Sequence, residues 1–120
     1  MARGIKILAQ GELGVTSFAN VYTVPTGAMA TFGSRDIYTA VVSSLVLCNR
    51  HSGTVSYNVR VVPSADTAAD KHIIFNARDL TTNATDVVSL GMGLVAGDEI
   101  DMFASVADKI SVTVFGIESV

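Results

Sequence analysis

Apolar residues dominate the middle of the chain, where two runs of β-forming residues flank a short polar turn. The first run, residues 41–48, is apolar at both odd and even positions, as in a strand that is covered on both sides. The second run, residues 55–61, alternates between apolar and polar side chains, as in a strand with one buried face. Residues 49–53 form the polar turn between them. The pattern therefore predicts a β-hairpin over residues 39–62, at the centre of a sheet.

The rest of the chain continues the β pattern in short segments separated by turn residues. Further strands are predicted at residues 5–11, 14–23, 28–32, 71–80, 86–90, 99–104 and 109–118. Residues 63–70 form the longest predicted loop, with room for one helical turn, and residues 91–98 form a second loop because three glycines interrupt them. No segment has the periodicity of a longer helix.

Eight or nine short strands with regular turn signals indicate an all-β chain. We predict one domain over residues 1–120, an antiparallel two-sheet β-sandwich of jelly-roll-like or immunoglobulin-like type. The sequence has no Trp and one Cys, so the immunoglobulin signature of two cysteines around a buried Trp is absent. This absence favours the jelly-roll-like alternative.

Charged residues make up only 16% of the 120 residues, whereas hydrophobic residues make up 49%. Because a soluble domain of this size usually carries more charge, we expect part of the surface to be buried against a partner. The net charge is −3 and the basic residues are scattered singly, which disfavours nucleic acid and anionic membranes as partners. We expect no membrane-spanning helix and no signal peptide, and the single cysteine fits synthesis in a reducing cytoplasm.

Few residues in the sequence have the spacing that catalysis or metal binding requires. Cys48 precedes His51 by three residues, but the pattern places the thiol at the end of an apolar strand and the imidazole in an exposed turn. A buried structural cysteine is therefore favoured over a nucleophile. His72 has no second histidine at ligand spacing, which disfavours zinc.

Two further motifs are also better explained without a ligand. The acidic residues Asp98, Glu99 and Asp101 lack the spacing of a calcium loop and fit a solvated strand face. The glycines of residues 91–97 precede an acidic strand, whereas a phosphate-binding loop needs a helix there. We therefore predict no catalytic residue, no cofactor and no metal.

Several segments spread along most of the chain match a known group of proteins. They are VYTVPTG at residues 21–27, VVSSLVLCNR at 41–50, YNVRV at 57–61, KH at 71–72, LGMGLVAGD at 90–98, FAS at 103–105 and FGIE at 115–118. In these segments the chain resembles small virion structural proteins of tailed bacteriophages, especially those of marine and cyanobacterial hosts. The resemblance implies a β-sandwich subunit of the particle, in the head or in the tail.

Composition and resemblance together predict a non-enzymatic virion structural protein that assembles in the host cytoplasm. The preferred role is a capsid decoration or cement protein that stabilises the shell by subunit–subunit contacts. Its expected partners are the major capsid protein or other virion proteins, and further copies of itself. One alternative is a tail or baseplate subunit, and another is a host-surface carbohydrate-binding module, which would have to use Tyr22, Tyr38 and Tyr57.

The polar turn of residues 49–53 is the predicted contact with a neighbouring subunit. It lies at one end of the predicted sandwich and carries Asn49, Arg50 and His51. Loops at the ends of a sandwich are exposed and can reach a neighbour without disturbing the core. We therefore expect these three residues to form a subunit contact.

Overall fold

The computed structural model describes residues 5–14, 16–25 and 39–119, so the strand predicted at residues 28–32 lies outside the described residues. Within them the chain forms eight strands and one short 3-10 helix. The strands are β1 (Lys6–Glu12), β2 (Ala19–Thr23), β3 (Thr39–Asn49), β4 (Val55–Val62), β5 (Ile73–Leu80), β6 (Thr85–Val95), β7 (Glu99–Ala104) and β8 (Ile110–Ser119), and the helix η2 (Asp70–His72) precedes β5.

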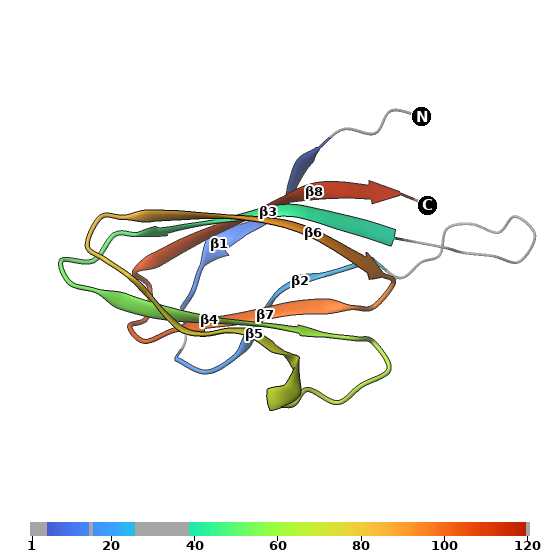
Figure 1. Ribbon diagram of the computed structural model, residues 1–120, viewed down its shortest axis with the longest axis horizontal. Coiled ribbons are helices and arrows are strands. Elements are labelled where there is room, and N and C mark those ends of the chain that lie inside the picture. The colour runs from blue at the N-terminus through green and yellow to red at the C-terminus, as the bar shows by residue number, and fades with distance from the viewer. Residues whose placement is uncertain (1–4, 15, 26–38, 120) are drawn as a thin grey trace, which may run out of the picture.

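The strands form two antiparallel sheets that lie face to face as two layers (Figure 1). Sheet A has the order β1-β8-β3-β6 and sheet B the order β2-β7-β4-β5. The pairs are nested in the sequence, because β1 pairs with β8, β2 with β7, β3 with β6 and β4 with β5. Nested pairs of this kind, shared between two four-stranded sheets, define a jelly roll. The predicted two-sheet sandwich is confirmed, and its topology is the jelly-roll one.

The predicted hairpin over residues 39–62 is wrong. β3 lies in sheet A between β8 and β6, whereas β4 lies in sheet B between β7 and β5. The turn after Asn49 therefore crosses from one layer to the other instead of joining two paired strands. Both strands are central in their sheets, but β3 is buried on its inner face only, since Val41 on the outer face is 47% exposed.

The core fills the space between the two sheets with side chains from alternate strand positions. Its fully buried members include Val42, Leu45 and Leu47 of β3, Val55, Tyr57 and Val59 of β4, Ile100 and Met102 of β7, and Ile110, Val112 and Val114 of β8. Burial of this apolar surface, at about 25 cal/mol per Å², is the main force that holds the two layers together. The same alternation directs every other side chain of each strand to an outer face.

The two predicted loops have different outcomes. β6 continues through Gly91 and Gly93 to Val95, so the predicted loop at residues 91–98 is mostly strand. Pairing with β3 overrides the low strand propensity of these glycines, and the turn is confined to the residues around Gly97, whose φ is 87°. At the end of the predicted loop of residues 63–70, the single 3-10 turn of η2 begins with Asp70.

Candidate functional site

Asn49 holds the crossing turn together from the inside. Its side chain is only 1% exposed, and its amide Nδ2 donates to the carbonyl oxygens of Gly53 at 3.0 Å and Leu80 at 2.9 Å. Its Oδ1 accepts a hydrogen bond from the backbone N–H of His51 at 2.8 Å. Because these bonds lie within the subunit, the part of the predicted contact that faces outward consists of Arg50 and His51.

Arg50 reaches from the turn along the end of sheet A. Its Nε donates to Ser111 Oγ at 2.8 Å, and its Nη2 donates to the carbonyl oxygen of Asp108 at 3.1 Å. The same guanidinium forms an ion pair with Glu12 of β1. Arg50 therefore neutralises the carboxylate at the rim of the outer face of sheet A.

Cys48 does not lie in the core as predicted. It is half-buried on the outer side of β3, while its neighbours Leu47 and Asn49 point inward and are buried. The sequence pattern failed here because both faces of this strand carry small or apolar residues. Cys48 instead lies between Thr85 of β6 and Ser111 of β8 on the outer face.

The outer face of sheet A is broad and carries exposed apolar side chains among serines and threonines, and we call it the sheet A outer face. By strand register it consists of Ile7, Gln10 and Glu12 of β1, Ser111, Thr113, Phe115 and Ile117 of β8, Val41, Ser44, Val46 and Cys48 of β3, and Thr85, Val87, Ser89, Gly91, Gly93 and Val95 of β6. Four of the six strongly exposed large hydrophobic residues in the described chain belong to it, among them Val87 at 65% and Val95 at 56% exposure.

The sheet A outer face carries almost no charge. Glu12 is its one charged member, and this carboxylate is paired with Arg50. The carboxylates of Asp86 and Glu118, on β6 and β8, turn toward the space between the layers, where they accept hydrogen bonds from buried tyrosines. Lys6 of β1 pairs with Glu118, at 3.1 Å between Nζ and Oε1. No uncompensated charge therefore remains among the described residues of this face.

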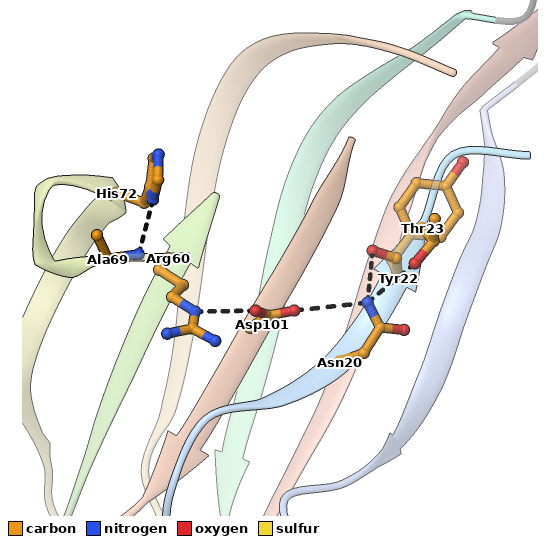
Figure 2. A network of polar contacts seen from close by, with 7 residues as sticks. All are labelled: Asn20, Tyr22, Thr23, Arg60, Ala69, His72 and Asp101. Carbon is orange, nitrogen blue, oxygen red and sulfur yellow. Dashed lines mark hydrogen bonds and ion pairs between the residues drawn. The ribbon is translucent and has the colours of Figure 1, made fainter. Parts of the chain in front are cut away.

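Part of the outer face of sheet B, across β4, β7 and β2, carries a polar network of its own (Figure 2). Asp101 of β7 accepts from Arg60 Nε of β4 at 2.8 Å and from Asn20 Nδ2 of β2 at 3.5 Å. The guanidinium of Arg60 also lies over the Phe18 ring, 4.2 Å from its centroid, and this ring packs edge-on against Phe103. The prediction of a solvated acidic face is therefore wrong for Asp101, which is 3% exposed.

The two tyrosines among the described residues do not form an exposed platform. Tyr22 and Tyr57 are buried between the sheets, and their hydroxyl groups donate to Glu118 and Asp86. Tyr38 lies outside the described residues. Because carbohydrate-binding sites rely on exposed aromatic faces, the burial of Tyr22 and Tyr57 removes most of the support for the carbohydrate-binding alternative.

The burial of Tyr57 predicts a loss of stability at alkaline pH. Desolvation, with the hydrogen bond to Asp86, raises the pKa of Tyr57 well above its ordinary value of 10.0. Above pH 10 the unfolded chain has lost this proton while the folded chain still holds it, so the free energy of unfolding falls as the pH rises. Urea titrations from pH 8 to 11 should show a shallower decline for Tyr57→Phe than for the unsubstituted protein. Equal slopes would contradict the assignment.

His72 has a structural environment rather than a catalytic one. The side chain is buried, and its Nδ1 accepts from the backbone N–H of Ala69 at 3.0 Å (Figure 2). Its Nε2 lies 3.1 Å from Asp66 Oδ2.

In the described part of the chain, no three His, Cys, Asp or Glu side chains gather as metal ligands would, and no pocket forms. No helix among the described residues is long and apolar enough to cross a membrane.

Comparisons with known proteins place the chain by its fold. No protein-family model and no curated protein sequence matches it. Among solved structures, a chain in the structure of infectious bursal disease virus, Gx strain, superposes on 98% of this chain with a TM-score of 0.50 and 9% sequence identity. A chain in the Gt strain of the same virus covers 97% with a TM-score of 0.48 and 9% identity. The chain spans only 30% and 31% of those two chains, and the similarity is one of fold.

Proposed function

We propose that this protein is a non-enzymatic structural subunit of a virus particle, with capsid decoration or cementing as its role. The observation that carries the proposal is the sheet A outer face, which exposes large apolar side chains and whose one charged member, Glu12, is paired with Arg50. Two further findings support it. The sequence resembles small virion proteins of tailed phages, and the fold is shared with a chain in a virus structure.

The physical mechanism is the burial of apolar strand surface against neighbouring subunits. An exposed patch that contains Val41, Val87 and Val95 is unfavourable in water and is favourable when a neighbour covers it. A subunit that binds across the junctions of a shell in this way would oppose the outward pressure of the packaged genome. This role requires a rigid scaffold and no reactive group.

The proposal is tested by adding fluorescently labelled subunit to particles from which the protein has been stripped. We expect saturable binding to heads, seen as co-sedimentation and as labelled heads in the microscope. Val87→Arg should weaken this binding, because it adds a charge to the sheet A outer face. Ile74→Arg, on sheet B, replaces another exposed apolar residue and serves as the control. Binding to tails alone would overturn the capsid role in favour of a tail or baseplate subunit.

The turn residues give a second test of the same proposal. Replacing Arg50 and His51 together by alanine should weaken particle binding several-fold, because Glu12 would lose its partner at the rim of the face. The fold should remain intact, since an exposed ion pair contributes only about 0–1 kcal/mol. Binding and thermal unfolding would be measured on the same preparation. Unchanged binding would remove this turn from the contact.

A further inference from the structure

We propose that the sheet A outer face binds the same face of a second copy of this chain, so that the protein is a two-fold symmetric dimer. The inference deepens the proposed function, on which it rests for its biological meaning, by naming the partner of this face. In a two-fold contact each copy contributes the same patch, so the patch must be complementary to itself. Charge, area and surface shape each support such a contact.

The charge of the face favours a second copy over a charged partner. Two copies that meet through one patch bring like charges together unless that patch is neutral. Here the face is neutral, because Glu12 is compensated within the subunit by Arg50. The net charge of −3 resides elsewhere, for example at Asp70, Asp79 and Glu99. An oppositely charged partner would find no charge pattern on this face to recognise.

The area of the face is sufficient for a stable dimer. The strands β1, β8, β3 and β6 have 7, 10, 11 and 11 residues, and at about 3.3 Å per residue and about 4.8 Å between strands they present a surface of about 600 Å². Two such faces would bury about 1,200 Å² in total, which reaches the lower end of stable protein–protein interfaces. The sheet B outer face is smaller, because β2, β7, β4 and β5 have only 5, 6, 8 and 8 residues, and Arg60 with the Phe18 ring covers part of it.

The side chains of the face also suit sheet-on-sheet packing. Two sheets pack about 10 Å apart when short side chains interdigitate. On this face the β-branched Val41 of β3 lies beside Gly93 of β6, and further along the same two strands Val46 lies beside Val87. Gly93 has no atom within 4 Å of the position where a β-carbon would lie, so the space above it, beside Val41, is open. A second copy rotated by 180° can place its own valines over this glycine.

The first experiment measures the mass of the purified protein by sedimentation equilibrium over a range of concentrations. We expect a reversible dimer for the unsubstituted chain. Val41→Arg, on the inner strand β3 of the face, should weaken dimerisation by at least about 100-fold, because each copy would bury an unpaired charge. Ile74→Arg, the matched control on sheet B, should leave the dissociation constant unchanged. Circular dichroism checks that each variant is folded.

A second experiment uses Cys48, the single cysteine of the chain, as a reporter on the same face. Its alkylation by a maleimide should be slow above the dissociation constant and several-fold faster when the protein is diluted below it. In the control variant, which combines Cys48→Ser with Ile74→Cys, the new thiol on sheet B should react at one rate at both concentrations. Concentration-independent reactivity of Cys48 would overturn the proposal.

The two proposals fail in different ways. A monomer at every concentration, or a dimer that Val41→Arg leaves unchanged, would overturn the inference of a second copy. If such a monomer still binds particles and Val41→Arg abolishes that binding, the occupant of the face is a different virion protein. A dimer that breaks as expected but binds no particle would uphold the inference and overturn the proposed function instead.

Discussion

Gly116→Ala is expected to prevent stable folding, although it adds only one methyl group. Gly116 is buried in β8, and a β-carbon there would collide with the carbonyl oxygen of Val41 in the neighbouring strand. It would also lie 2.8 Å from Leu8 Cδ1. The carbonyl belongs to the backbone of a central strand, so it cannot move without disturbing the pairing of β3 with β8. Overpacking of this kind costs about 3 kcal/mol or more, a large part of a domain's stability.

The matched control is Gly11→Ala in β1, where no atom lies within 4 Å of the added β-carbon. This variant should equal or exceed the unsubstituted protein in stability, because alanine restricts the unfolded chain more than glycine does. Urea unfolding at a fixed protein concentration compares the two variants. If Gly116→Ala were as stable as Gly11→Ala, the close approach of β3 and β8 would be wrong.

Asp101→Leu is expected to cost about 3 kcal/mol of unfolding free energy. The carboxylate is buried, and it is the ion-pair partner of Arg60, whose side chain is only 20% exposed. Removing it leaves a mostly buried guanidinium without its counter-ion, which is far more costly than losing an exposed pair. Asn20 would also lose an acceptor. Chemical denaturation of the single variant measures the effect.

A double-variant cycle separates the ion pair from simple loss of packing. Asp101→Leu combined with Arg60→Met should recover much of the lost stability, because no unpaired charge remains in the double variant. The control is an exposed ion pair, in which Lys71 Nζ lies 3.8 Å from Asp66 Oδ2. Lys71→Ala should change the free energy of unfolding by less than about 1 kcal/mol. If the two single losses simply added in the double variant, the pair would not be coupled.

Alternating apolar residues predicted most of the strands and the two-layer architecture correctly. Period-two alternation decides which side of a strand is buried, and this signal is strong in β4 and β8. It does not decide whether consecutive strands pair or lie in different layers, which is why the pattern wrongly predicts β3 and β4 to be one hairpin. Likewise, glycines such as Gly93 suggest a loop, and only the pairing of β6 with β3 shows that the strand continues.

The polar network on sheet B was beyond the reach of sequence analysis. The sequence predicts a solvated Asp101 because Glu99, two positions before it on the same side of the strand, is also acidic. Its burial depends on Arg60 and Asn20, which come from β4 and β2, strands far apart in the sequence. The order of the strands in sheet B brings these residues together, and the local sequence pattern does not predict that order.

For the proposed interaction surface, the sequence pattern predicts cover on both faces of β3, and the structure shows cover on one face only. Residues 41–48 are apolar on both sides, which predicted a strand covered on two faces. Within one subunit only the inner face of β3 is covered, and Val41 on the outer face stays exposed. In the proposed dimer, a second copy provides the cover that the sequence pattern predicted. The turn at Arg50 was singled out from sequence, whereas the wider face required the strand register.

The most direct test of this account is an electron cryo-microscopy map of the assembled virus particle at a resolution that traces strands. We predict that jelly-roll subunits lie on the outside of the shell in pairs, with the two sheet A outer faces stacked and Val41 and Val87 buried between them. A map in which these subunits are well ordered but the sheet A outer face is open to solvent would contradict the account.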